Sequence, residues 1–187
     1  MKKVYFFLLT IFLSVEVIAQ KGMYESIEIG FGSNFSKNEN AMTALDVDFI
    51  GGYEFSEKFR IGLVFPVSYM VFRDELRTRH KDISIGLGFN VNTLLHTSDI
   101  ISLRADISFS ICDLNPFTKS EPDWIFFRGK AVFQCYFNRF LTNRISPFVS
   151  LGMSYYFDSH NLPDNKIKNY QYVIPMIGVG ITSKSSK

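Results

Sequence analysis

Nine charged residues lie on the polar faces of segments in which apolar and polar residues alternate. They are Glu28, Asp46, Asp48, Arg60, Asp82, Arg104, Asp106, Arg128 and Lys130. Such residues could form a structural ion-pair network, a gated ion path or a catalytic carboxylate pair. We interpret them as an interior charge network, because charges that are buried singly are costly and must pair. Asp46 and Asp48 share one face, and the expected neutralising partner is Arg60 or Arg104.

The three histidines are the other residues that could do chemistry. Ser159 and His160 have the residue types of a nucleophile and its general base, but neighbours on a loop seldom hold the required hydrogen-bond geometry. No two of His80, His96 and His160 have metal-ligand spacing, and no Cys/His cluster exists. We therefore expect no catalytic residue, no metal site and no cofactor.

The charged residues belong to segments with the two-residue period of β-strands. In Asp82–Asn92, the odd-numbered residues are apolar and the even-numbered ones are Asp, Ser, Gly and Asn. Successive side chains of a strand point to opposite faces, so this segment is a two-faced strand. We expect eight strands, and their ranges are 24–33, 42–55, 59–72, 81–94, 100–112, 124–137, 145–157 and 170–182.

The connections between these segments alternate in length. The longer ones are 34–41, 73–80, 113–123 and 158–169, and the shorter ones are 56–58, 95–99 and 138–144. Outer-membrane barrels have long external loops and short periplasmic turns. The basic segment Arg73–Lys81 could contact lipopolysaccharide phosphates, although a solvated loop is the simpler interpretation.

The N-terminus has the pattern of a signal peptide. Lys2 and Lys3 precede an apolar core of about ten residues, too short for a membrane-spanning helix, which needs about 20. Val17 and Ala19 fit a cleavage site after Ala19. We therefore expect a signal peptide over 1–19 and one domain over 20–187. Loss of Lys2, Lys3 and Glu16 leaves a net charge near +1, which does not suggest a nucleic-acid partner.

Alternation alone does not say which face of the strands lies inside. A lipocalin-like carrier would have an apolar interior and a polar outer face. Here the polar face consists mainly of small residues with a few charges of both signs, which fits a narrow interior. Aromatic residues near the segment ends predict two girdles at the membrane interfaces. These residues are Tyr69, Phe72, Trp124, Tyr155 and Phe157 toward the loops, and Phe55, Phe59 and Phe137 toward the turns.

The chain resembles the small OmpA/OmpX-like outer-membrane β-barrel domain family in three features. They are the alternation, the even strand count and the repeated glycines on the polar face, Gly30, Gly32, Gly86, Gly88, Gly178 and Gly180. The resemblance implies an all-β, eight-stranded antiparallel up-and-down transmembrane β-barrel in the outer membrane. The last strand departs from the family pattern because it does not finish on a terminal aromatic residue. The assembly machinery would then use another feature, such as Tyr170 and Tyr172. Pro66, Pro147 and Pro175 predict bulges or irregular pairing.

These observations lead to three hypotheses of function. The first is a non-enzymatic outer-membrane barrel with a closed, salt-bridged interior, acting in envelope integrity, adhesion or surface interaction through its loops. The alternatives are an outer-membrane lipid A-modifying enzyme and a periplasmic lipocalin-like carrier. For the first, the expected partners are outer-membrane lipid and lipopolysaccharide, the outer-membrane assembly machinery and an unknown surface partner, and we expect a monomer.

Overall fold

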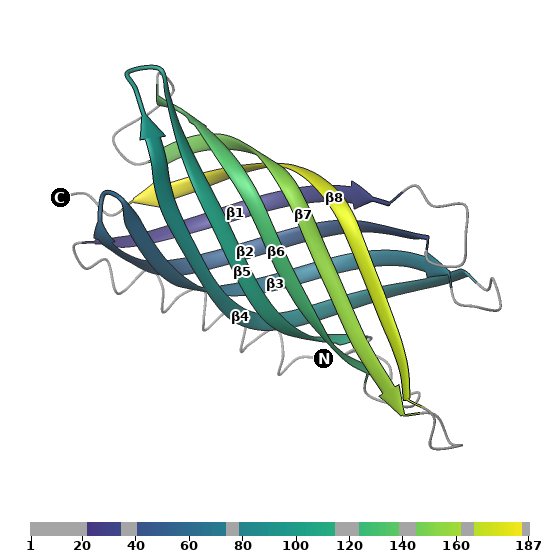
Figure 1. Cartoon of the computed structure of the whole chain (residues 1–187). Coiled ribbons are helices and arrows are strands. Elements are labelled where there is room, and N and C mark those ends of the chain that lie inside the picture. The colour runs from purple at the N-terminus through teal and green to yellow at the C-terminus, as the bar shows by residue number, and fades with distance from the viewer. Residues whose placement is uncertain are drawn as a thin grey trace, which may run out of the picture.

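The computed structural model describes residues 22–34, 41–73, 79–114, 124–138, 145–161 and 167–184. Their strands are β1 (Met23–Ser33), β2 (Met42–Ser56), β3 (Phe59–Arg73), β4 (Arg79–Thr97), β5 (Ile101–Leu114), β6 (Trp124–Phe137), β7 (Ile145–Asn161) and β8 (Ile167–Lys184). Each strand pairs antiparallel with the next, and β8 pairs with β1 (Figure 1). The predicted all-β, eight-stranded up-and-down barrel is therefore confirmed. The predicted signal peptide over 1–19 lies outside the described residues.

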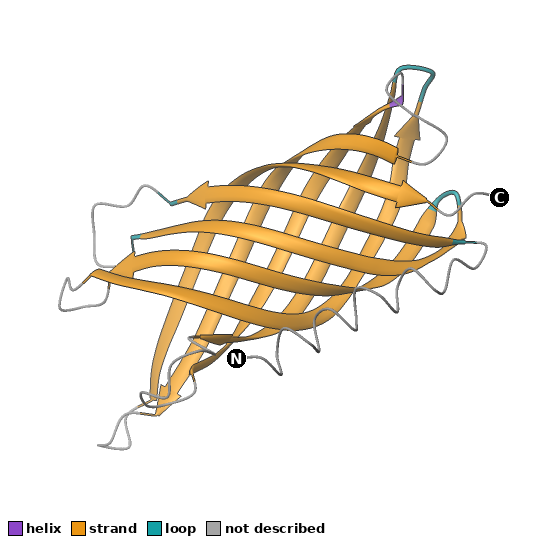
Figure 2. Cartoon of the chain, turned by 180° about the vertical axis from the view of Figure 1, so that it is seen from behind, coloured by secondary structure: helices purple, strands orange, loops and turns teal. Residues whose placement is uncertain are grey.

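Strands make up almost all of the described chain (Figure 2). Within these ranges, no helix is long and apolar enough to cross a membrane. The short turns 57–58 and 98–100 lie at one end of the barrel, together with the start of β1 and the end of β8. We call this the turn end, and the opposite end the loop end.

The strands are staggered as they wind around the barrel. A path through directly paired residues starts at Arg104 on β5, goes once around the barrel and returns to β5 at Leu114, ten residues further along. Such a stagger goes with strands tilted by about 35–45° to the barrel axis, and eight strands leave an interior just wide enough for side chains. Side chains from opposite walls can therefore meet in the lumen.

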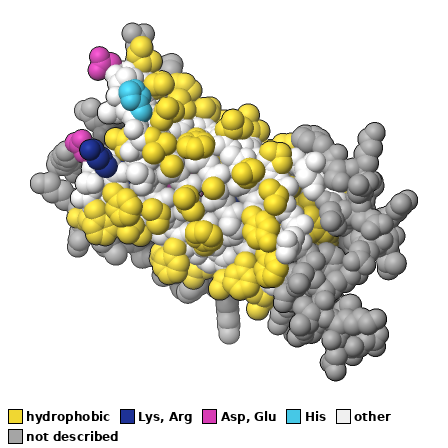
Figure 3. Space-filling model, viewed as in Figure 1, with side chains coloured by type: hydrophobic (Ala, Val, Ile, Leu, Met, Phe, Trp, Pro, Cys, Tyr) yellow, Lys and Arg dark blue, Asp and Glu magenta, His cyan; other side chains and the backbone are white. Residues whose placement is uncertain are grey.

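The polar face of the strands lies inside. Through most of every strand the even-numbered residues are buried and the odd-numbered ones are exposed or half-buried. Large apolar side chains cover the outer wall, among them Phe89, Phe109, Leu151 and Ile177, which are between 62% and 68% exposed. Figure 3 shows the apolar side chains spread over the strands and the charged ones gathered at the turn end. The lipocalin-like alternative is wrong, because its faces would be the reverse of these.

Several strand ends differ from the expected boundaries. β7 continues to Asn161 and pairs with β8 from Ile167, so Ser159 and His160 belong to a strand and not to a loop. β3 continues to Arg73 and β4 begins at Arg79, so both ends of the expected charged segment are strand, and its larger part, 74–78, lies outside the described residues.

The three prolines disturb the sheet less than expected. Pro66 interrupts the β3–β4 ladder between residues 64 and 67, without changing its register. Pro147 lies beyond the last pair of the β6–β7 ladder, and Pro175 lies beyond the last pair of the β1–β8 ladder. The two register shifts lie beside the turns, at 54–56 and 94–96. Two of the three prolines thus lie just beyond the end of one of the two ladders of their strand, where a missing N–H costs no bond in that ladder.

The aromatic residues also separate by face. Tyr69 and Tyr155 near the loop end, and Phe55 and Phe59 near the turn end, are exposed on the outer wall as the girdle prediction requires. Phe72 was wrongly assigned to a girdle, because its even position directs it inward against Tyr172, with ring centroids 6.3 Å apart. The side chain of Trp124 lies outside the described residues. Phe137 and Phe157 are half-buried at the outer wall.

The orientation of the faces can be tested with an arginine on the outer wall. Leu87 lies outward near the middle of β4 and is 54% exposed. We expect Leu87→Arg to lower the free energy of unfolding in lipid vesicles by about 2–4 kcal/mol, the usual cost of a cation on the lipid face at the midplane. Thr93→Arg, outward near the turn end of the same strand, should cost about 0–1 kcal/mol. If both substitutions changed the free energy of unfolding by the same small amount, the outer wall would not face lipid.

Candidate functional site

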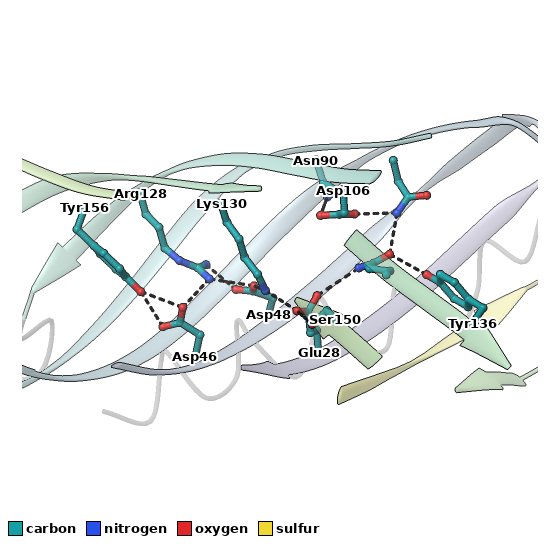
Figure 4. A network of polar contacts seen from close by, with 12 residues as sticks. Glu28, Asp46, Asp48, Asn90, Asp106, Arg128, Lys130, Tyr136, Ser150 and Tyr156 are labelled. Carbon is teal, nitrogen blue, oxygen red and sulfur yellow. Dashed lines mark hydrogen bonds and ion pairs between the residues drawn. The ribbon is translucent and has the colours of Figure 1, made fainter. Parts of the chain in front are cut away.

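The interior of the barrel is divided into layers along its length. Near the loop end is an apolar cluster of Met42, Ala44, Met70, Cys112, Phe126, Tyr156, Tyr172, Ile174 and Met176. Near the turn end is a smaller one of Tyr24, Ile50 and Val64. Buried charged and amide side chains lie next to both clusters and extend to the turn 57–58, where Arg104 binds the backbone oxygen of Glu57. This polar layer, drawn in Figure 4, is the candidate site, because it holds most of the charged residues singled out from the sequence.

Arg128 on β6 is the centre of the loop-side half of this layer. Its Nη1 lies 2.6 Å from Asp48 Oδ1, and its Nη2 lies 2.7 Å from Asp46 Oδ2. The hydroxyl of Tyr156 donates to the same Asp46 carboxylate at 2.9 Å. All of these side chains are buried, with Asp46 fully inaccessible. One guanidinium thus binds both carboxylates that share a face of β2, and its fork of donors suits such a pair.

Lys130, two residues further along β6, continues the network. Its Nζ lies 2.8 Å from Glu28 Oε1 on β1 and 2.7 Å from Asp48 Oδ2 on β2. Glu28 also accepts hydrogen bonds from Ser150 on β7 at 2.6 Å and from Gln134 on β6 at 3.2 Å. β6 is not a neighbour of β1 or β2 in the sheet, so these ion pairs cross the lumen and join opposite walls (Figure 4).

Amides connect this charged group to the turn-end half of the layer. Asn92 donates to Gln134 Oε1 at 2.8 Å and to Asp106 Oδ2 at 2.9 Å, and Asn90 donates to Asp106 Oδ1 at 2.8 Å. Arg104 donates to Asn92 Oδ1 at 2.7 Å. Asp106 therefore accepts hydrogen bonds from two neutral amides, and a single amide lies between it and the nearest guanidinium.

Two aromatic hydroxyls complete the network beside the turn end. Tyr24 donates to Asn90 Oδ1 at 3.1 Å, and Tyr136 donates to Gln134 Oε1 at 3.0 Å. The Tyr136 hydroxyl is also 3.2 Å from Thr182 Oγ1, which lies 3.0 Å from Ser26 Oγ. The connected hydrogen bonds thus run from Tyr156 near the loop end to the turn end.

The structure corrects the expected partners of Asp46 and Asp48. Arg60 pairs with Glu54 on the adjacent strand, with Nε 2.7 Å from Oε2, and its guanidinium lies 5.1 Å from the centre of the Tyr24 ring. Arg104 binds Asn92 and the backbone oxygen of Glu57. Both arginines lie too near the turn end to reach Asp46, and Arg128 and Lys130 take their place.

Asp82 is the remaining one of the nine predicted charges. It is half-buried toward the loop end of β4, opposite Met70 of β3. Both cysteines are free, with Cys112 buried inside the barrel and Cys135 half-buried.

Glycine on β8 gives the carboxylate of Glu28 its space. A Cβ at Gly178 would lie 2.6 Å from Ser150 Oγ and 3.0 Å from Glu28 Oε1. Any side chain there would therefore displace the hydrogen bond between these two groups. At this one of the repeated glycines noted in the sequence, the missing side chain leaves room for the Glu28 carboxylate and its hydrogen bond to Ser150.

Sequence reasoning did not identify several polar members of the layer. These are Glu54, Asn90, Asn92, Gln134, Tyr136, Ser150 and Tyr156. Most share one signal, an even position on a strand whose even positions include a predicted interior charge. Selecting charged residues alone overlooked the neutral groups that buried charges need for hydrogen bonding.

The arrangement is suited to bracing the barrel. Its carboxylates are bound by cations or amides, and the network residues other than Glu54 are at most 6% exposed. Within the described ranges, no group of three or more His, Cys, Asp or Glu residues could hold a metal ion. A buried ion pair is costly to break from one side, because the remaining charge is left without its partner.

Removal of Arg128 tests how strongly the layer depends on its central cation. We expect Arg128→Met to lower the free energy of unfolding by about 3–5 kcal/mol, because Asp46 loses its cation and Asp48 keeps only Lys130. Urea unfolding of the refolded protein in lipid vesicles measures this free energy. Arg104→Met is the matched control, since it removes the same group from a site where the hydrogen-bond acceptors are neutral. An equal decrease in the free energy of unfolding in both variants would show that the layer does not depend specifically on Arg128.

The comparisons with known proteins concern the fold. No protein-family model matches the chain, and no curated protein matches its sequence significantly. Neisserial surface protein A (NspA) is 12% identical with a TM-score of 0.53, covering 88% of this chain and 97% of its own. OprG from Pseudomonas aeruginosa is 10% identical with a TM-score of 0.51, covering 90% and 98%. The outer membrane enzyme PagL is 9% identical with a TM-score of 0.48, covering 84% and 97%. The chain has the fold of the small eight-stranded outer-membrane β-barrels.

Proposed function

We propose that the protein is a non-enzymatic outer-membrane barrel with a closed interior, which serves envelope integrity, adhesion or surface interaction through its loops. The observation that carries this proposal is the ion-pair layer of Arg128 and Lys130 with Glu28, Asp46 and Asp48, which crosses the lumen. It makes the barrel a braced scaffold that presents loops and not a pathway through the membrane.

The outer wall supports the membrane location in this proposal. Its apolar side chains surround the barrel on every strand and would be exposed to water in a soluble protein. Apolar surface of this extent marks contact with lipid or with another protein. In this proposal residues 1–19 direct export, the turn end faces the periplasm, and the loops face outward into lipopolysaccharide.

The residues inside the barrel support the proposal that its lumen is closed to ions. An ion that moves along the axis would meet the apolar cluster at the loop end and then the cross-lumen pairs. To pass, it would have to displace Arg128 or Lys130 from carboxylates 2.6–2.8 Å away. Separation of buried, hydrogen-bonded charges costs several kcal/mol, so the resting barrel should not conduct ions.

The proposed partners follow from this location. They are outer-membrane lipid and lipopolysaccharide around the wall, the assembly machinery during insertion, and an unidentified partner at the loops, with the barrel itself monomeric. The suggested role of Tyr172 in assembly is not favoured, because its side chain is buried inside the barrel, near the loop end of β8. The enzymatic alternative requires that Ser159 and His160 cooperate, although they occupy consecutive positions of a strand.

Conductance tests the closed interior. We expect the purified barrel to give no channel currents in planar bilayers. We expect currents from a variant in which Arg128, Lys130, Asp46 and Asp48 are all replaced by alanine, because this change removes the cross-lumen side chains and leaves few unpaired charges. A shift in gel migration on boiling in SDS checks that both proteins are folded barrels. Steady currents from the unmodified protein would contradict the proposal, as would a lipid A change that depends on Ser159 and His160.

A further inference from the structure

The loop-side half of the buried layer has one negative charge in excess. Glu28, Asp46 and Asp48 face only Arg128 and Lys130 as cations within ion-pair distance in the described part of the chain. All five side chains are at most 4% exposed. Bulk water does not screen a charge at such a position, so an unmatched one is costly.

The other half of the layer does not offset this excess. Toward the turn end the cations are Arg60 and Arg104, and the carboxylates are Glu54 and Asp106, which makes two of each sign. Arg60 is held by Glu54, and Arg104 is joined to Asp106 through the amide of Asn92. The excess is therefore confined to the group around Arg128.

Asp46 is the carboxylate with the fewest donors in that group. Glu28 accepts from three side chains, and Asp48 accepts three hydrogen bonds from Arg128 and Lys130. Asp46 Oδ2 accepts from Arg128, whereas Oδ1 is reached only by the Tyr156 hydroxyl. The single proton of that hydroxyl is shared with Oδ2, so Oδ1 has no donor of its own.

Two serines beside Asp46 have unused hydroxyls. Ser68 on β3 lies directly opposite Asp46, and Ser84 on β4 lies directly opposite Ser68. Both residues are fully buried on the inner face, and neither hydroxyl has a hydrogen-bond partner among the described residues. Buried polar atoms are nearly always bonded to protein or to water, so these hydroxyls point to a ligand in the lumen. Nε of Arg128 also lacks an acceptor, which a water molecule in the same space would supply.

We propose that a small monovalent cation of the Na⁺ or K⁺ kind, with water, binds between Asp46 Oδ1 and the hydroxyls of Ser68 and Ser84. The ligands are all oxygen atoms, as hard cations prefer. One positive charge cancels the excess, whereas a divalent cation would reverse it. The inference rests on the proposed closed interior, because an open, hydrated lumen would need no bound ion for neutrality.

Unfolding in different salts tests the site. The refolded full-length barrel is unfolded with urea in uncharged phosphatidylcholine vesicles, in NaCl or KCl and in choline chloride of equal concentration, so that charge screening is the same. We expect a higher urea midpoint in Na⁺ or K⁺, with a saturating dependence on its concentration, because the cation binds the folded state. Choline is too large for a buried site formed by side chains of three neighbouring strands.

Three variants test whether the difference between the salts arises at this site. Asp46→Asn removes the excess charge and should abolish the difference between the salts. Ser68→Ala should reduce it, because one ligand is lost. Ser26→Ala is the matched control, since it removes an inward hydroxyl near the turn end that bonds Thr182, and it should leave the difference unchanged.

The outcomes separate this inference from the proposed function. Equal midpoints of the unmodified barrel in sodium and choline salts would overturn the cation site, and would leave water alone as the partner of the serines. A salt difference that persists in both Asp46→Asn and Ser68→Ala would also overturn it. The proposed function would survive either result, provided that the barrel still shifts on boiling in SDS and gives no channel currents.

Discussion

The structure depends on the need of charged side chains in a narrow, water-poor lumen to find partners. Arg128 and Lys130 on β6 meet this need for three carboxylates on β1 and β2. These strands are far apart around the barrel, so the ion pairs act across it, whereas the ladders of backbone hydrogen bonds act only between neighbours. The neutral amides of Asn90, Asn92 and Gln134 connect the charged groups along the axis.

The same constraint explains the contrast between the two faces of the wall. A stagger of ten residues around eight strands leaves a lumen that side chains fill, so inward positions hold small residues beside the long charged ones. Gly178, next to the Glu28–Ser150 hydrogen bond, is one such position. The outward positions have no such limit and hold Phe, Leu and Ile. Lipid contact and lumen closure are therefore two consequences of one alternating pattern.

Much of the fold could be predicted from the sequence, because the side-chain period of a strand is directly visible in it. Eight strands and nine candidate charges followed from that period, and the inward face followed from the small residues on the polar side of the strands. The pairing partners did not, because they depend on the stagger: Arg60 is near Asp48 in the sequence but lies toward the turn end, whereas Arg128 is distant in the sequence and meets it across the lumen. The end of β7 was placed too early and the start of β8 too late, because the residues there do not alternate between polar and apolar.

The most direct test of this account is a double-mutant cycle between Glu28 and Lys130, measured by urea unfolding in lipid vesicles. Glu28→Gln, Lys130→Met and the double variant give the coupling between two residues that lie on opposite walls, 2.8 Å apart. A bracing ion pair predicts a favourable coupling of about 1.5–3 kcal/mol. Additive losses, with a coupling near zero, would show that the two walls are not held together by this pair.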